Sequence, residues 1–151
     1  MVEIISYQER YHPDFRRLNL EWLEKYGLVE SHDLEVLDDP EGTVIARGGQ
    51  IFFAKKDEQI VGSAGLWKES GDEYELVKMA VDPAYRGQGI SKVLLEHCLA
   101  EVKRLKAKKI FLYSNSQLKT ALKLYEQYGF RHVDPKNAPF ETADVKMELA
   151  L

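Results

Sequence analysis

The fold is decided by the stretch from Glu75 to Ser91, which runs Glu75-Leu-Val-Lys-Met-Ala-Val-Asp-Pro-Ala-Tyr-Arg-Gly-Gln-Gly-Ile-Ser91. It begins with a β-prone run, breaks at Pro83, passes through Gly87 and Gly89, and continues with apolar residues at helical spacing. A strand that leads into a helix through a tight glycine turn brings several unpaired backbone N–H groups to one point. Because the start of a helix also carries partial positive charge, we expect an anion to bind there.

Three phosphate-binding patterns can be compared with this turn. The P-loop pattern G-x-x-x-x-G-K-[ST] is absent, and the dinucleotide pattern G-x-G-x-x-G fails at Lys92, where its last glycine is required. The acyl-coenzyme A turn R/Q-x-x-G-x-G/A is matched by Arg86 and Gly89, with Ser91 in place of the final glycine or alanine. Taken alone, the turn is a weak signal, and a tight connection that binds nothing is a competing interpretation, as is a nucleotide-binding domain that shares such a turn.

Apolar periodicity and turn residues predict the other elements. Four helices are expected: one from about residue 15 to a cap at Gly27, a short one over 31–37 ended by a turn at 39–42, a long one from Gly89, and one from Ser114 to about Tyr128. The β-prone runs lie at 2–6, 50–54, 59–67, 74–81, 109–113, 130–133 and 144–149. This order predicts helices that cover a mixed sheet.

Two motifs make the chain resemble the Gcn5-related N-acetyltransferase (GNAT) family. The first is residues 74–83 with the glycine turn that follows, and the second is residues 121–130, which contain the pattern L-Y-x-x-x-G-F. The resemblance covers essentially all of residues 1–151 in element order and implies one N-acetyltransferase domain. It implies an α/β (α+β) fold with a mixed sheet of about six to seven strands flanked by four helices. Two central parallel strands, 74–81 and 109–113, would splay apart and hold acetyl-coenzyme A between them, with its pyrophosphate on the turn.

The resemblance also implies roles for individual residues. Backbone groups of Met79, Ala80 and Val81 would pair with the pantetheine arm, much as an added strand does. The pyrophosphate would be held by Arg86, Gly87, Gln88, Gly89, Ile90 and Ser91. Asn115 would contact the cofactor, and its residue type also suits a helix N-cap. Tyr125 would lie close to the thioester sulfur and protonate the leaving thiolate, although its spacing is also that of a core aromatic residue.

A general base is the other requirement, because acetyl transfer needs a neutral amine. Glu75 is the candidate, since it matches a glutamate that serves as base in similar proteins, directly or through water. Strand alternation predicts that it shares a face with Val77 and Met79, and apolar neighbours would raise its pKa. A backbone N–H near Met79 is expected to meet the charge that develops on the carbonyl oxygen. The alternative is an ordinary exposed carboxylate at a strand edge.

The acceptor is less well defined. Between Asn19 and Gly42 there are eight acidic residues and one basic residue, Lys25. This composition is compatible with a solvated helical face or with a rim whose field attracts a cationic substrate. The rim hypothesis favours a small cationic amine such as a polyamine, attacked directly because no activated cysteine or serine is evident. A protein or peptide amine and a non-catalytic acyl-coenzyme A-binding regulatory module are the alternatives.

Composition limits the remaining classes of function. The net charge of −4 disfavours nucleic-acid binding. No apolar run is long enough for a membrane span and no signal-peptide pattern is present, and a single cysteine, Cys98, allows no internal disulfide, so a cytoplasmic location is expected. Cys98 lies on a helical apolar stripe and is expected to be buried. The histidines lack metal-ligand spacing, so no metal is assigned, and the resemblance allows a homodimer without requiring one.

Overall fold

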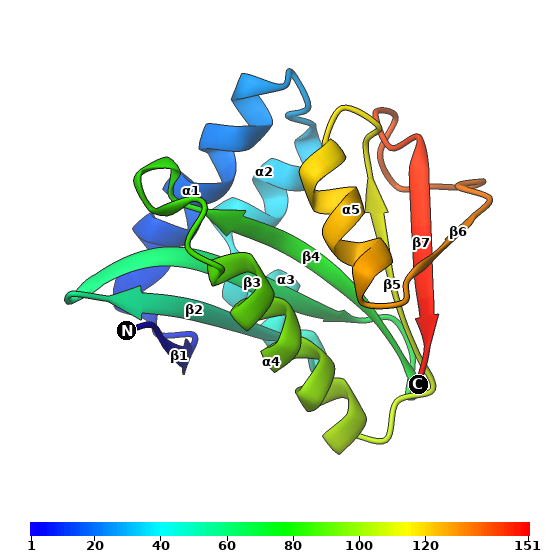
Figure 1. Cartoon of the computed structure of the whole chain (residues 1–151), viewed down its shortest axis with the longest axis horizontal. Helices are drawn as coiled ribbons and strands as arrows, with labels where there is room; N and C mark the ends of the chain where they lie inside the picture. Colours follow the sequence, from blue (N-terminus) through cyan, green and yellow to red (C-terminus); the bar gives the residue numbers. More distant parts are fainter.

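The computed structural model describes residues 1–151, and a seven-stranded sheet in the order β1-β2-β3-β4-β5-β7-β6 lies at its centre (Figure 1). The strands are β1 (Glu3–Ser6), β2 (Gln50–Lys56), β3 (Gln59–Lys68), β4 (Glu73–Val81), β5 (Lys109–Ser114), β6 (Arg131–Val133) and β7 (Val145–Ala150). All neighbouring strands are antiparallel except β4 and β5, which are parallel. The expected mixed sheet is therefore confirmed.

Helices cover both faces of this sheet. In Figure 1, α4 (Ile90–Arg104) and α5 (Lys119–Gln127) lie on one face, while α1 (His12–Lys25) and α2 (Ser31–Asp38) lie on the other. The shorter elements are α3 (Pro40–Thr43) and the 3-10 helices η1 (Glu9–Tyr11), η2 (Ile45–Arg47) and η3 (Pro83–Tyr85). Each face has its own buried apolar cluster, one around α4 and one around α1. None of the helices has both the length and the apolar character needed to cross a membrane.

Two boundaries differ from the sequence-based expectation for local reasons. α5 begins at Lys119 instead of Ser114, because the preceding residues form a turn in which the Leu118 N–H donates to the Asn115 carbonyl (3.0 Å). The turn predicted at residues 39–42 is instead the N-cap and the first residues of α3, in which the Asp39 carboxylate accepts from the Gly42 N–H (3.0 Å).

The central parallel pair is short. Residues 73–75 of β4 pair with residues 109–111 of β5, and the pairing stops there. Beyond this point the strands diverge, as Figure 1 shows from their common base near the C-terminus. β5 remains paired with β7 along its other edge, so the β4 edge from Leu76 onward has no partner strand on this side. The expected splay is confirmed, and it leaves free backbone groups in the middle of the sheet.

Candidate active site

A cleft of about 710 Å³ fills the opening between β4 and β5. It reaches from the turn before α4 to the ends of α1 and α2 and to the β6–β7 loop (residues 134–144). Of the residues predicted from the sequence, those that line it are Glu75, Met79, Ala80, Val81, Arg86, Gly87, Gly89, Ile90, Ser91, Asn115 and Tyr125. Gln88 does not line the cleft, and its side chain accepts a hydrogen bond from Lys56 Nζ (2.7 Å).

The glycine turn presents a row of unused backbone donors. Gly87 and Gly89 have φ of 78° and 77°, and a Cβ built on either would meet nothing within 4 Å, so glycine is needed for the backbone conformation and the space beside it is open. The N–H groups of residues 87–92 have no acceptor within the protein. The Arg86 guanidinium instead donates to both carboxylate oxygens of Glu21 on α1 (3.2 Å each). The anion site is therefore built from backbone, with the Arg86 side chain engaged elsewhere.

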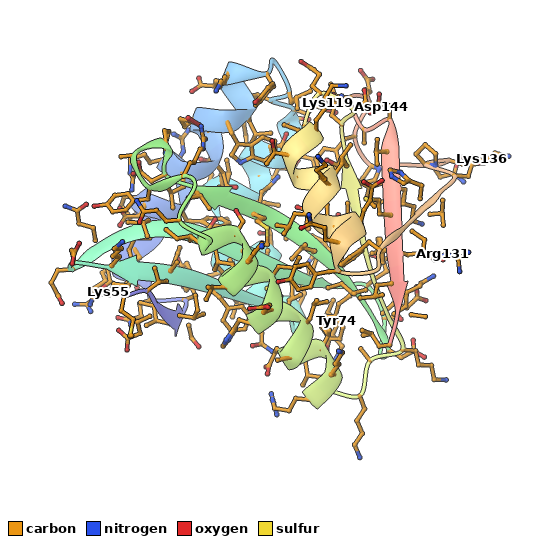
Figure 2. All side chains as sticks on the ribbon, viewed as in Figure 1. Lys55, Tyr74, Lys119, Arg131, Lys136 and Asp144 are labelled. Carbon is orange, nitrogen blue, oxygen red and sulfur yellow. The ribbon has the colours of Figure 1, made fainter.

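Basic side chains also line the cleft. Lys92 of α4 and Lys119 and Lys123 of α5 line it. Figure 2 places Lys119 at the start of α5, whereas Arg131 and Lys136 project from the outer edge of the sheet, away from the cleft. The cleft is thus lined by basic side chains of both α4 and α5, which suits a ligand with several phosphate groups.

Glu75 lies at the fork, as the last residue of β4 that pairs with β5. The residue is only 9% exposed. Burial, helped by the nearby Glu69 carboxylate, raises the pKa of Glu75 to about 7 against the opposing effect of Lys78 and Lys146. A carboxylate that changes protonation near neutral pH is well suited to accept a proton during catalysis.

A β-bulge interrupts β4 at Lys78, three residues after Glu75. Val77 pairs with Gly65 and Ala80 pairs with Ser63, so β4 uses one residue more than β3 over this interval. Lys78 has φ of 52°, a left-handed conformation that is uncommon outside glycine. Its carbonyl accepts from the Ser63 hydroxyl (2.8 Å), which gives this backbone group a partner where the ladder is interrupted.

Buried polar side chains connect the bulge to α1. Asn19 is fully buried, and its Nδ2 donates to Ser63 Oγ (3.1 Å) and to the Phe15 carbonyl (2.9 Å). Its Oδ1 accepts from Trp22 Nε1 (3.3 Å), and Trp22 lines the cleft. A continuous chain of hydrogen bonds therefore runs from the cleft wall through Asn19 and Ser63 to the bulge.

The bulge changes which face of β4 each side chain occupies. The expectation that Glu75 and Met79 share a face is wrong, because the extra residue reverses the alternation between them. Glu75 pairs with Trp67, which packs with the α1 cluster. Met79 packs with the α4 cluster, where the Tyr125 hydroxyl lies 3.8 Å from its Sδ. Glu75 and Tyr125 therefore approach the cleft from opposite faces of the sheet.

The Lys78 side chain forms an ion pair with Asp33 of α2, and the two side chains are only 7% and 3% exposed. Lys78 Nζ also lies 5.4 Å from the ring centre of Phe140 on the β6–β7 loop. The pair joins the bulge, α2 and this loop around one point. The sequence showed Asp33 only as one of several acidic residues, and nothing in it indicated Lys78 as its partner.

We expect Asp33→Asn to lower the free energy of unfolding by about 3–5 kcal/mol, because it leaves the Lys78 ammonium buried without a counter-charge. The double variant Asp33→Asn/Lys78→Met should recover all but about 1 kcal/mol, since both charges are then absent and the asparagine oxygen can still accept from the Glu30 N–H (2.9 Å in the wild type). Urea denaturation of the two variants and the wild type measures the difference. A single variant as stable as the wild type would show that the pair is not buried in solution.

The β6–β7 loop is fastened across the end of the cleft next to α2. The Glu30 carboxylate accepts from the N–H groups of Glu141 (2.9 Å) and Thr142 (3.0 Å) and from the Thr142 hydroxyl. Asn115 Nδ2 donates to the Thr142 carbonyl (2.6 Å). Asn115 is thus an anchor for this loop and not the cap of α5, whose first residue lies four positions further on.

Most carboxylates of the acidic segment 19–42 are engaged within the chain. Four are close to a basic side chain: Glu21 to Arg86, Asp33 to Lys78, Asp38 to Arg16 and Glu35 to His32. Three accept hydrogen bonds: Glu30 from the β6–β7 loop, Asp39 from the Gly42 N–H and Glu41 from the Tyr7 hydroxyl. Glu24 has no such contact. The segment mainly holds the first helices in place, which argues against a free acidic rim.

Cys98 has no part in this site. It is fully buried on α4, as expected, and burial raises the pKa of its thiol to about 12. Such a thiol is a poor nucleophile at neutral pH.

A splayed parallel pair with an anion turn after one strand and a carboxylate at the fork can hold a phosphate-bearing ligand beside a proton acceptor. Comparison with known proteins agrees. The acetyltransferase (GNAT) domain family model matches residues 47–132. An uncharacterised N-acetyltransferase of Escherichia coli (strain K12), YjgM, is 32% identical over 117 residues, which cover 73% of this chain and 70% of that protein. The chain belongs to the GNAT family of acetyltransferases.

Solved structures and further relatives give the range of the family. A GNAT-family acetyltransferase from Staphylococcus aureus Mu50 has a TM-score of 0.91 at 24% identity, covering 100% of this chain and 99% of that one. The PaiA N-acetyltransferase of Thermoplasma acidophilum, solved in complex with coenzyme A, has a TM-score of 0.79 at 20% identity, with coverage of 100% and 99%. The ribosomal protein bS18-alanine N-acetyltransferase of E. coli is 33% identical over 73 residues, 48% of this chain and 49% of that protein.

Proposed function

We propose that residues 1–151 form one N-acetyltransferase domain, which transfers acetyl from acetyl-coenzyme A to the primary amine of a small molecule by direct attack. One observation carries this proposal. Glu75 stands at the fork with a pKa raised to about 7, and Tyr125 reaches the cleft from the opposite face. The base, Glu75, can therefore act on the amine while the acid, Tyr125, acts on the thiolate, and direct displacement requires both.

The residues present fit the donor. The free N–H groups of residues 87–92 and the lysines around them would hold its phosphate groups. The open edge of β4 at Met79, Ala80 and Val81 would pair with the amide groups of its pantetheine arm. Acetyl-coenzyme A, when bound, supplies an activated thioester carbonyl at the end of that arm. Coenzyme A in the Thermoplasma relative supports this assignment.

The chemistry requires three proton movements. The acceptor ammonium first loses one proton through Glu75 to solvent, which leaves a neutral amine and returns Glu75 to its carboxylate form. The amine nitrogen then forms a bond to the acetyl carbon, the carbon–sulfur bond breaks, and the second amine proton passes to the Glu75 carboxylate, directly or through water. The Tyr125 hydroxyl donates a proton to the departing thiolate. Burial raises the pKa of Tyr125, which keeps this hydroxyl protonated at neutral pH. Solvent then exchanges protons with both groups.

A small acceptor is favoured by the β6–β7 loop. Glu30 and Asn115 fasten it across the end of the cleft, where a protein chain would need an open groove. The alternative, a protein or peptide amine, is the acceptor class named for the bS18-alanine relative.

Thiol release from acetyl-coenzyme A in the presence of a panel of primary amines tests the proposal, with mass spectrometry of the products. We expect amine-dependent release and an N-acetylated amine, with no acetyl group on the protein at any time. A chain that binds acetyl-coenzyme A and releases no thiol with any amine or peptide would instead be a regulatory module.

We expect Gly89→Val to weaken acetyl-coenzyme A binding by about tenfold or more, because a β-branched residue at φ 77° costs about 1–2 kcal/mol and displaces the N–H groups at the start of α4. Isothermal titration calorimetry measures this change. The matched control is Gly71→Val, since Gly71 lies in a β3–β4 turn with open space and no positive φ. Equal affinities of the two variants for acetyl-coenzyme A would show that the turn is not part of the binding site.

A further inference from the structure

We infer that the acceptor is a monoamine with an apolar body, and that polyamines are poor substrates. The inference rests on the proposed function and concerns the half of the cleft that lies beyond Glu75, between α1, α2 and the β6–β7 loop. It follows from which charges this half offers and from what its walls are made of.

Only one carboxylate in the cleft is available to a cationic ligand. The acidic residues that line the cleft are Asp33 and Glu75. Asp33 already forms a buried ion pair with Lys78, and no basic side chain forms an ion pair with Glu75. The acidic segment supplies no second partner here, since Glu21 is held by Arg86 and Glu30 by the β6–β7 loop. The cleft therefore accommodates one ammonium group, at Glu75.

Apart from Glu75, the Lys78–Asp33 pair and Thr142, the side chains that line this half are apolar. α1 and the residues after it contribute Trp22, Leu23, Tyr26 and Leu28, and the β6–β7 loop contributes Phe140. The polar atom of Trp22 is bonded within the protein, to Asn19, which leaves the rest of its ring for contact. These side chains favour an apolar body on the acceptor.

A second ammonium group would be penalised. It would lose its hydration against apolar walls without a carboxylate to compensate. The Lys78–Asp33 pair in this half of the cleft offers no counter-charge, because its carboxylate is already engaged. This cost is absent for an alkyl or aryl group of the same length.

Hexylamine and hexamethylenediamine form a matched pair of probes, because they differ only in the second ammonium group. With the wild-type protein and saturating acetyl-coenzyme A, we expect kcat/KM for hexylamine to exceed that for the diamine by about tenfold or more. Equal values, or a preference for the diamine or for spermidine, would overturn the inference and leave the proposed function standing. No thiol release with any amine, despite acetyl-coenzyme A binding, would overturn both.

Phe140→Ala tests the apolar wall. We expect it to lower kcat/KM for hexylamine by about tenfold while ethylamine, which is too short to use the wall, changes by less than about twofold. Phe140→Leu should restore most of the hexylamine activity, and the KM for acetyl-coenzyme A should stay constant in both variants. An equal loss for the two amines would show that Phe140 only supports the loop and would overturn the assignment of the wall.

Discussion

Glu75→Gln is expected to lower kcat by about 10²–10³-fold and to leave the dissociation constant of acetyl-coenzyme A within about twofold of the wild-type value. The substitution keeps the shape of the side chain and removes its ability to accept the amine proton. Because Glu75 lies at the fork and not at the glycine turn, donor binding does not depend on its charge. Steady-state kinetics with titration calorimetry separate the two effects.

The pH dependence of activity tests whether Glu75 is the general base. Its pKa of about 7 means that the carboxylate form is lost as the pH falls below neutrality. The ratio of wild-type to variant kcat/KM, measured with one amine, should therefore be constant above pH 7 and fall about tenfold per pH unit below it. Ionisation of the acceptor is common to both proteins and cancels in this ratio. A flat ratio down to pH 5 would exclude Glu75 as the base.

The pH dependence of stability is an independent test of the raised pKa of Glu75. The contribution of Glu75 to stability should fall as the pH rises, whereas activity should increase. The folded-state pKa of Glu75 lies above its ordinary value of 4.5, so the folded protein holds this proton more tightly than the unfolded chain does. The contribution of Glu75 to stability is complete below that ordinary value and is lost as the pH rises through 7. At pH 8 the glutamine variant should be more stable than the wild type by about 1–3 kcal/mol. Glu58→Gln, in the exposed β2–β3 hairpin, is the control. We expect it to change neither the activity nor the pH dependence of stability.

The turn and its flanking elements could be predicted because their causes are local. Gly87 and Gly89 supply the positive φ that the connection needs, and the apolar spacing after them is a property of adjacent residues. The open edge of β4 follows from the family resemblance over residues 74–83 and 121–130. The residues predicted for the donor line the cleft, except that Gln88 lies outside it, and the Arg86 side chain is paired with Glu21.

The bulge could not be predicted, because its causes lie far away in the chain. Lys78 carries no local signal for φ of 52°. The conformation is held by Ser63, by Asn19 behind it and by the ion pair with Asp33, all of which approach only in the folded protein. Strand alternation therefore gave the wrong face for Met79, and only the structure separates it from Glu75.

The acceptor half of the cleft could not be predicted for the same reason, because its contacts join residues that are far apart in the chain. Acidic composition in segment 19–42 suggested a free rim, because the sequence does not show which cation each carboxylate will meet. Asn115 and Glu30 likewise act through a β6–β7 loop whose anchoring depends on tertiary contacts. Ion pairs and hydrogen bonds between distant residues cannot be deduced from a single sequence. Once they are known, the acceptor that we expect is an apolar monoamine and not a polyamine.

Tyr125→Phe is expected to lower kcat by about 10–10²-fold, with acetyl-coenzyme A affinity unchanged, because the departing thiolate loses its proton donor. The ring still packs against Phe130, so only the contact of the hydroxyl with Met79 Sδ disappears and the fold should persist. Tyr128→Phe is the matched control. Its hydroxyl lies near the end of the same helix and donates to Glu96 Oε2 (2.8 Å), and its removal should leave kcat within about twofold.

The two variants should also differ in their response to pH. Burial raises the pKa of Tyr125 above its ordinary value of 10.0, so the hydroxyl stays protonated and wild-type kcat should not decline on the alkaline side up to that pH. Tyr125→Phe should retain the acidic limb that Glu75 produces, because the two groups act from opposite faces of the sheet. If Tyr125→Phe kept full activity, the tyrosine would be a core residue alone, and the thiolate would have to leave unprotonated or take its proton from water.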